Sequence, residues 1–96
     1  HGGVTASILD VAGGMAAFFH LRHRMKGQPL PKVAQHFSRF GTVDLRIDYL
    51  RPGRGKSFTA TGVILRSGSR IAVARMELHN EEGKLLAVGT GTYMVG

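Results

Sequence analysis

The first part of the chain carries apolar residues at the spacing of a helix. From Val4 to about Phe19 they recur every three or four positions, a period that predicts an amphipathic α-helix. This apolar stripe consists of Val4, Ile8, Val11, Met15 and Phe18. Beside it lies a face of small residues interrupted by one carboxylate, made of Gly3, Ala6, Asp10, Gly13 and Ala17. Glycine costs about 1 kcal/mol relative to alanine inside a helix, so the small face indicates close approach of either a sheet or a ligand.

A polar connection follows, and the chain then alternates as β-strands do. Residues His20 to Ser38 form the connection, which Gly27 to Pro31 interrupts, and a short second helix is expected around Val33 to Phe40. Four segments predict strands, at residues 42–49, 58–65, 71–78 and 85–95, with Gly62 as a possible bulge. In the first strand the apolar side is Val43, Leu45, Ile47 and Tyr49, and the polar side is Thr42, Asp44, Arg46 and Asp48. One helix followed by four strands in meander order predicts an α+β fold, an antiparallel sheet wrapped on a helix.

Composition narrows the function classes. A chain of 96 residues forms a single domain with a thin core. The absence of cysteine excludes zinc ribbons, iron–sulfur clusters and thiol nucleophiles, and it fits a reducing compartment. His20 and His23 could share a helix face, but no neighbouring carboxylate completes a ligand set, so we expect no metal. The longest nearly uncharged run, Gly2 to Phe19, contains Asp10 and several glycines, and we expect it not to span a membrane.

The charge of the chain is strongly positive. Thirteen Lys and Arg against six Asp and Glu give a net charge of +7, which attracts polyanions such as nucleic acid, acidic membranes or a phosphorylated ligand. A nucleic-acid-binding module is therefore one alternative. The chain has no Trp, however, and its two Tyr residues fall on separate predicted strands, so it offers no aromatic platform for stacking bases. We expect no nucleic-acid partner.

The start of the predicted helix carries candidate chemistry. His1, Gly2 and Gly3 lead directly into the helix, whose first amides lack intrahelical partners and can stabilise a developing negative charge. Asp10 can act as a base or a nucleophile if its surroundings tune it. Amides that bind an oxyanion and a nearby carboxylate suit acyl transfer or hydrolysis.

These residues lie in segments that resemble a known family. The stretch from His1 to Ala16 resembles the active-site segment of PaaI-like hotdog-fold acyl-CoA thioesterases, and Thr42 to Pro52 resembles the strand that follows it there. Three further blocks, Arg51–Lys56, Ala74–Glu82 and Thr92–Gly96, look like the YigI-type subgroup of bacterial medium- and long-chain acyl-CoA thioesterases. The resemblance covers essentially the whole chain.

The resemblance implies a fold, an assembly and a set of roles. The fold would be a curled antiparallel sheet around a central helix, N-terminally incomplete here because relatives carry a strand upstream of His1. The assembly would be a homodimer, or a tetramer made of two dimers, with active sites at the dimer interface. The Gly2 amide would polarise the thioester carbonyl, with Gly3 and His1 shaping the helix start. Asp10 would be the base or nucleophile, contributed by the other subunit, and Thr42 would orient water. Relatives often carry an Asn or Gln ahead of the segment that begins at His1, and this sequence does not include that position.

The basic and bulky residues complete the expected site. Coenzyme A carries phosphates that arginine forks and loop amides suit, and the resemblance places the nucleotide on two turns, although a solvated basic loop remains an alternative for any single arginine. The candidate CoA-binding residues are Arg51, Pro52, Arg54, Arg66, Gly68, Ser69 and Arg70. Met15, Phe18 and Phe19 are candidates to line the acyl chain, which we expect to be of medium or long chain length.

The expected function is hydrolysis of acyl-CoA in the cytoplasm without a cofactor, CoA being part of the substrate. A hotdog protein that senses acyl-CoA or malonyl-CoA without cleaving it is an alternative, but such regulators carry a DNA-binding helix-turn-helix, and the presence of Asp10 argues against it. Hydratases of this fold place a His with their carboxylate at a spacing that this segment does not show. A dimer is expected for a further reason: a chain this short has little core with which to cover the small face of the helix.

Overall fold

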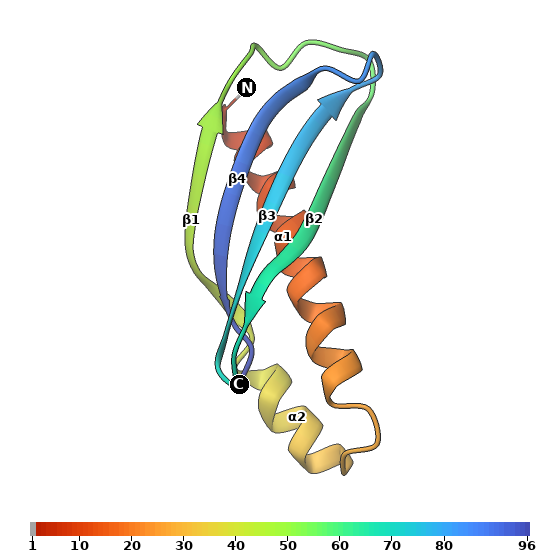
Figure 1. Cartoon of the computed structure of the whole chain (residues 1–96), viewed down its shortest axis with the longest axis vertical. Helices are drawn as coiled ribbons and strands as arrows, with labels where there is room; N and C mark the ends of the chain where they lie inside the picture. The colour runs from red at the N-terminus through yellow and green to blue at the C-terminus, as the bar shows by residue number, and fades with distance from the viewer. Residues whose placement is uncertain (1) are drawn as a thin grey trace.

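The computed structural model describes residues 2–96, so His1, predicted to shape the helix start, lies outside the described residues. The element order is α1 (Gly2–Arg24), α2 (Leu30–Ser38), β1 (Gly41–Tyr49), β2 (Phe58–Ser67), β3 (Ile71–Asn80) and β4 (Leu85–Met94). The four strands form one curled antiparallel sheet, α1 runs along one face of it, and α2 lies at one end (Figure 1). The α+β architecture predicted from the hydrophobic pattern is confirmed.

The strand order is β1-β4-β3-β2, so the predicted meander holds only for the last three strands. β1 pairs with β4, the last strand, instead of with β2. The connection of residues 50–57 therefore carries the chain across one end of the sheet, from the β1 edge to the β2 edge (Figure 1). Alternation of apolar residues defines strands but not their neighbours, which is why the order departs from the prediction.

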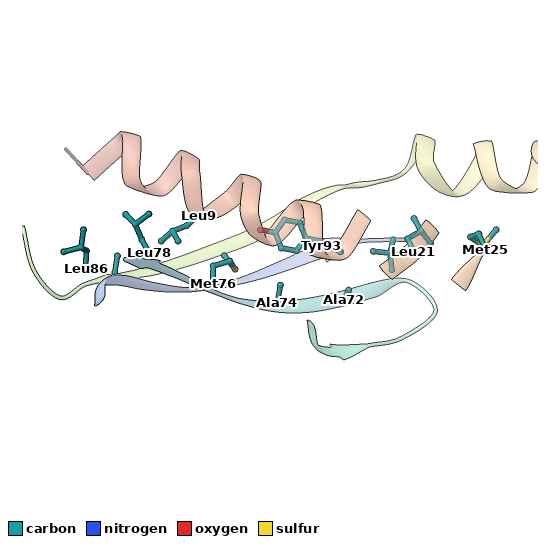
Figure 2. Close-up of a cluster of buried hydrophobic side chains, with 12 residues drawn as sticks. Leu9, Leu21, Met25, Ala72, Ala74, Met76, Leu78, Leu86 and Tyr93 are labelled. Atoms are coloured by element: carbon teal, nitrogen blue, oxygen red, sulfur yellow. The ribbon is translucent and has the colours of Figure 1, made fainter. Parts of the chain in front are cut away.

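The face of α1 that packs on the sheet includes Gly13 and Ala17 of the small face. The buried residues of α1 are Leu9, Gly13, Ala17 and Leu21, spaced four positions apart. Leu9 and Leu21 belong to the same core cluster as Met76 and Tyr93 of the sheet (Figure 2). The apolar stripe points elsewhere: Val11 is 61% exposed and Met15 51%, and Val4 and Phe18 are exposed as well. Of the two readings of the small residues, close approach of a sheet is the one observed. Its own sheet buries Gly13 and Ala17, whereas Gly3 is exposed and Ala6 and Asp10 are half-buried, so the covering of this face by a second subunit stays a prediction.

Two glycines allow this close approach. A Cβ at Gly13 would overlap the Tyr93 hydroxyl and the Met76 sulfur, and a Cβ at Gly62 of β2 would overlap the carbonyl of Ala12 in α1. Gly62 lies in regular pairing with Met76, and the bulge of β2 falls later, between Ile64 and Arg66. Gly62 is therefore required by helix–sheet contact, not by a bulge.

α1 continues five residues past its predicted end at Phe19. Leu21 within the helix and Met25 just beyond it extend the buried row, and Arg22 and Arg24 place positive charge where the helix dipole favours it. At 23 residues, α1 is long and apolar enough to cross a bilayer by length and composition, contrary to the expectation from Gly2 to Phe19. It is nevertheless the core helix of this fold, since it contacts all four strands.

Candidate active site

Asp10 is the only acidic residue of α1, and two hydroxyl groups from the sheet reach it. Thr42 Oγ1 donates to Asp10 Oδ1 over 3.0 Å. The Tyr93 hydroxyl lies 3.1 Å from the same oxygen and 3.1 Å from the backbone carbonyl of Asp10. Thr42 and Tyr93 are direct partners across β1 and β4, and such partners project side by side on one face of a sheet. The sheet register therefore places both donors at one carboxylate.

A bulge in β1 is what turns Thr42 toward α1. Regular alternation puts Thr42 on the polar side with Asp44 and Arg46, and this was the prediction. The pairing of β1 with β4 shifts between Thr42 and Asp44, and an extra residue at such a point reverses which face the following side chains occupy. Leu45 and Ile47 pack on the core as predicted, whereas Val43 is 53% exposed and Thr42 contacts Asp10.

Tyr93 was not among the residues that sequence reasoning selected. Its side chain is 1% exposed, and its oxygen points to α1 (Figure 2). Burial above all, and then the charge of Asp10 and the hydrogen bond to it, raise the pKa of the Tyr93 phenol well above its usual value. The phenol therefore stays protonated and donates. A buried tyrosine needs a partner for its hydroxyl, which was the available signal, although the sequence does not say which group supplies that partner.

The start of α1 opens on a cleft of about 390 Å³. The Tyr49 hydroxyl donates to the carbonyl of Gly2 over 2.8 Å and ties the end of β1 to the helix start. Gly2, Thr5, Tyr49, Leu50, Arg51, Pro52, Gly53, Leu86 and Ala87 line this cleft. The structure thus brings Gly2 together with Arg51 and Pro52, and it adds Tyr49, which sequence reasoning treated only as an apolar strand position. Gly3 lies exposed in the first turn, where its carbonyl accepts a hydrogen bond from Ser7.

Within one chain the helix start does not meet the carboxylate. Gly2 and Asp10 are eight positions apart on one helix, a separation of about 12 Å along the axis at 1.5 Å per residue. A reacting group must lie about 3 Å from both an oxyanion donor and a base. The two groups can therefore serve one substrate only if they come from different chains.

The connection between β1 and β2 is held by the turn between β3 and β4. Asn80 Nδ2 donates to the carbonyl of Arg54 over 3.2 Å. The carboxylate of Glu81 accepts the amide of Lys56 at 3.1 Å and that of Ser57 at 3.3 Å. Its own amide first, and then those of Lys56 and Ser57, lower the pKa of Glu81 and favour its charged form. Asn80 and Glu81 therefore set the path of the loop that carries Arg51 and Arg54.

The second basic turn joins β2 to β3 at the opposite end of the sheet (Figure 1). It is fixed to the end of α1, since Arg24 donates to the carbonyls of Gly68, at 2.5 Å, and Ser69, at 3.3 Å. The His20 ring lies 2.7 Å from the Ser67 hydroxyl. A shallow pocket of about 370 Å³ is lined by Arg66, Gly68, Ser69, Arg70, Ile71 and Val73. One chain does not bring these residues near Arg51 and Arg54.

The three candidates for the acyl chain lie in three settings. Met15 lines an apolar groove of about 380 Å³ with Ile8, Val11 and Ala60. The ring of Phe18 packs on Phe37, with ring centres 4.9 Å apart, and on Phe40, at 5.8 Å. Phe19 lines another pocket, between the end of α1 and α2. Across residues 2–96 no three His, Asp or Glu side chains gather as a metal site would require.

Comparison with known proteins identifies the class. The family model of the thioesterase superfamily matches residues 1–87 of the 96, and the chain therefore belongs to that superfamily. The medium/long-chain acyl-CoA thioesterase YigI of Escherichia coli K12 is 54% identical over 96 residues, which are 100% of this chain and 62% of that protein. The chain thus spans less than two thirds of the length of this relative. The expected resemblance to a YigI-type thioesterase is confirmed.

Solved structures agree on the fold. A crystal structure of a Shewanella oneidensis protein related to the thioesterase superfamily superposes with a TM-score of 0.93 at 54% identity, covering 100% of this chain and 63% of that one. A Bacillus halodurans protein crystallised with CoA has a TM-score of 0.76 at 30% identity, covering 98% of this chain and 57% of that one. The predicted hotdog fold is confirmed.

Proposed function

We propose that this chain forms the catalytic part of an enzyme that hydrolyses medium- to long-chain acyl-CoA thioesters. The observation that carries the proposal is the placement of Asp10, a carboxylate on an otherwise small-residue helix face, beside two hydroxyl groups of the sheet. Membership of the thioesterase superfamily and 54% identity to YigI, itself named a medium/long-chain acyl-CoA thioesterase, support the reaction and the substrate class.

Asp10 acts on water or on the thioester itself. As a base, its carboxylate takes a proton from water while the water oxygen attacks the carbonyl carbon. The carbon–sulfur bond then breaks, and the proton passes to the departing thiolate, which leaves the free acid and CoA. As a nucleophile, the carboxylate forms an anhydride with the acyl group and releases CoA, and water then cleaves the anhydride. In both routes the Gly2 amide stabilises the oxyanion.

Two chains supply one site. The separation of about 12 Å between Gly2 and Asp10 on one helix supports a homodimer, or a pair of dimers, in which one subunit gives the amide and its partner the carboxylate. The exposed apolar stripe of α1, including Val11 and Met15, supports the same assembly, because large apolar patches mark interfaces. Met15 and Phe18 of this stripe, together with the neighbouring Phe19, are the proposed acyl-chain residues.

The same assembly explains the two basic turns. A single CoA nucleotide contacts both turns only if they come from different subunits, since the two turns lie at opposite ends of β2, a strand of ten residues, about 33 Å. The proposed phosphate ligands are Arg51, Arg54, Arg66 and Arg70, with the backbone of Pro52, Gly68 and Ser69. The Bacillus halodurans relative crystallised with CoA supports a CoA site on this fold. We place the enzyme in the cytoplasm and assign it no cofactor.

The test is hydrolysis of a panel of acyl-CoA chain lengths by the parent and by Asp10→Asn. This variant keeps the shape of the side chain and removes the base, so we expect turnover to fall at least ~10²-fold. Asp48→Asn on the outer side of β1, where the carboxylate is exposed and pairs with Arg46, is the matched control and should keep parental activity. An Asp10→Asn enzyme within a few-fold of the parent removes Asp10 from the mechanism. A parent that binds acyl-CoA without cleaving it supports the sensing alternative.

A single-turnover reaction in heavy-oxygen water detects a nucleophilic Asp10 whose anhydride water opens at the aspartyl carbon, because the carboxylate then acquires the label. Opening at the acyl carbon puts the label in the product acid and leaves Asp10 unlabelled, as a base does. Mass analysis of the peptide that contains Asp10 reads the result.

A further inference from the structure

We propose that Tyr93 is a positioning residue for Asp10: together with Thr42 it holds Oδ1 in place, so that Oδ2 is the oxygen that reacts. The inference rests on the proposed function and concerns how the catalytic group is prepared. The comparisons and the resemblance assign no role to Tyr93.

The two oxygens of the Asp10 carboxylate have different surroundings. Oδ1 lies 3.0 Å from the Thr42 hydroxyl and 3.1 Å from that of Tyr93. Among residues 2–96, no side chain or amide donates to Oδ2. In that same part of the chain every buried side-chain nitrogen or oxygen has a hydrogen-bond partner. Because Asp10 is half-buried and Oδ2 lacks a partner, Oδ2 must be reached by solvent. The oxygen open to water and substrate is therefore Oδ2.

Tyr93 is the more rigid of the two donors. Its ring is 1% exposed and stacks on Phe40 with ring centres 6.4 Å apart. The hydroxyl sits over Gly13, where any side chain would collide with it. Thr42 is exposed and can turn about one bond, but the phenol can leave Asp10 only if the core moves. The burial that raises the pKa of the phenol also keeps its proton in place as the pH rises.

Fixing one oxygen matters because a carboxylate rotates easily. The last torsion of aspartate is broad, so an untethered carboxylate presents either oxygen at a range of angles. Attack or proton transfer requires alignment within a fraction of an ångström, and small misplacements slow reactions by large factors. The single proton of the Tyr93 hydroxyl is shared between Oδ1 and the backbone carbonyl of Asp10, each at 3.1 Å, and this forked contact ties the side chain to its own helix turn.

The experiment compares Tyr93→Phe with the parent enzyme. The variant keeps the ring and loses only the hydroxyl, so kcat should fall roughly tenfold while KM for acyl-CoA stays within about twofold. Val95→Ala, a buried change two residues along the chain from Tyr93, is the control for stability, and its kcat should stay near that of the parent at temperatures where both are folded.

A crystal structure of Tyr93→Phe supplies a reading independent of activity. We expect the Asp10 carboxylate to adopt more than one orientation there, against one in the parent. A kcat of Tyr93→Phe within about twofold of the parent, a single unchanged carboxylate, or an equal loss in Val95→Ala overturns the inference. If Tyr93→Phe does not fold, Gly13→Ala replaces it, since the added methyl displaces the same hydroxyl, and an unchanged kcat in that variant is equally decisive against it.

The experiments distinguish failure of the positioning role of Tyr93 from failure of the proposed function. A parent without acyl-CoA hydrolysis rejects the function, and the two crystal structures still show whether Tyr93 holds the carboxylate. An active parent whose activity depends on Asp10 but not on Tyr93 rejects only the positioning role.

Discussion

The middle of α1 and its first turn carry the two halves of the proposed reaction, and they are built differently. Around Asp10 the helix lies tightly on the sheet and Gly13 is buried. Thr42 and Tyr93 of the same chain donate hydrogen bonds to the Asp10 carboxylate. Around Gly2 the helix start faces an open cleft of about 390 Å³, and the Tyr49 hydroxyl ties it to β1. A single chain supplies the surroundings of the Asp10 carboxylate, whereas the cleft at Gly2 stays open in a single chain. In the proposed homodimer, the partner subunit therefore enters at the helix start.

Mixing two inactive variants tests this division most strongly. Asp10→Asn removes the carboxylate, and Gly2→Pro removes the amide donor at a helix position where proline is tolerated. Each alone should lose at least ~10²-fold in turnover. In a hybrid dimer, one of the two sites has both original groups, so an equal and fully exchanged mixture should regain about a quarter of the parental activity.

Subunit exchange must first be established by native mass spectrometry. Confirmed hybrids that stay inactive while both variants are folded contradict a site shared between chains. A protein that is monomeric at micromolar concentration contradicts it equally.

Sequence reasoning succeeded where one chain's local pattern decides the outcome. Alternation located the strands to within two residues at either end, and helical spacing located both helices. It missed the neighbour of β1, because pairing with β4 depends on the path of a loop. It also left open what packs on the small face of α1, a sheet or a ligand, because the helix has an apolar and a small face and periodicity does not say which of them meets the sheet.

The site shows the same limit. Asp10 could be chosen from sequence because a lone carboxylate on a small-residue face is conspicuous, and the resemblance pointed to Thr42. Regular alternation alone puts Thr42 on the polar side of β1. This prediction fails because one extra residue at the bulge reverses the alternation. Tyr93 escaped notice because its contact with Asp10 joins residues 83 positions apart. Tyr93 and Asp10 come together only through the register of β4 on β1 and the packing of α1 on the sheet.

Two neighbouring glycines, Gly13 and Gly14, test how closely α1 lies on the sheet near Asp10. A Cβ at Gly13 would overlap the Tyr93 hydroxyl and the Met76 sulfur, whereas a Cβ at Gly14 would lie 3.6 Å from the Tyr93 ring, an ordinary contact. Gly13→Ala should therefore destabilise the fold by about 1–3 kcal/mol through overpacking, despite its better helix propensity. Gly14→Ala should stabilise it by up to about 1 kcal/mol. Denaturant unfolding measures both, and equal effects of the two substitutions would show that the helix does not sit as closely on the sheet as described.

Substitutions in the two basic turns give the smallest expected effect, a weaker binding of acyl-CoA, and they test the proposed nucleotide site. Arg54→Ala and Arg66→Ala should each weaken binding of acyl-CoA by about 1–2 kcal/mol, because each removes a charged hydrogen-bond donor to a phosphate. Acyl-pantetheine analogues, which lack the nucleotide phosphates, should lose much less. Arg46→Ala on the outer side of β1, where the arginine is exposed and pairs with Asp48 at 3.6 Å, is the matched control and should change the binding of neither substrate.

Added salt should raise KM for acyl-CoA in the parent more than in the two variants, since it screens the contacts between these arginines and the phosphates. Because the two arginines lie at opposite ends of the sheet within one chain, a loss specific to CoA in both variants requires turns from two subunits at one nucleotide. A loss confined to one variant assigns the nucleotide to that turn alone, and equal losses on CoA and pantetheine substrates place both arginines outside the nucleotide site.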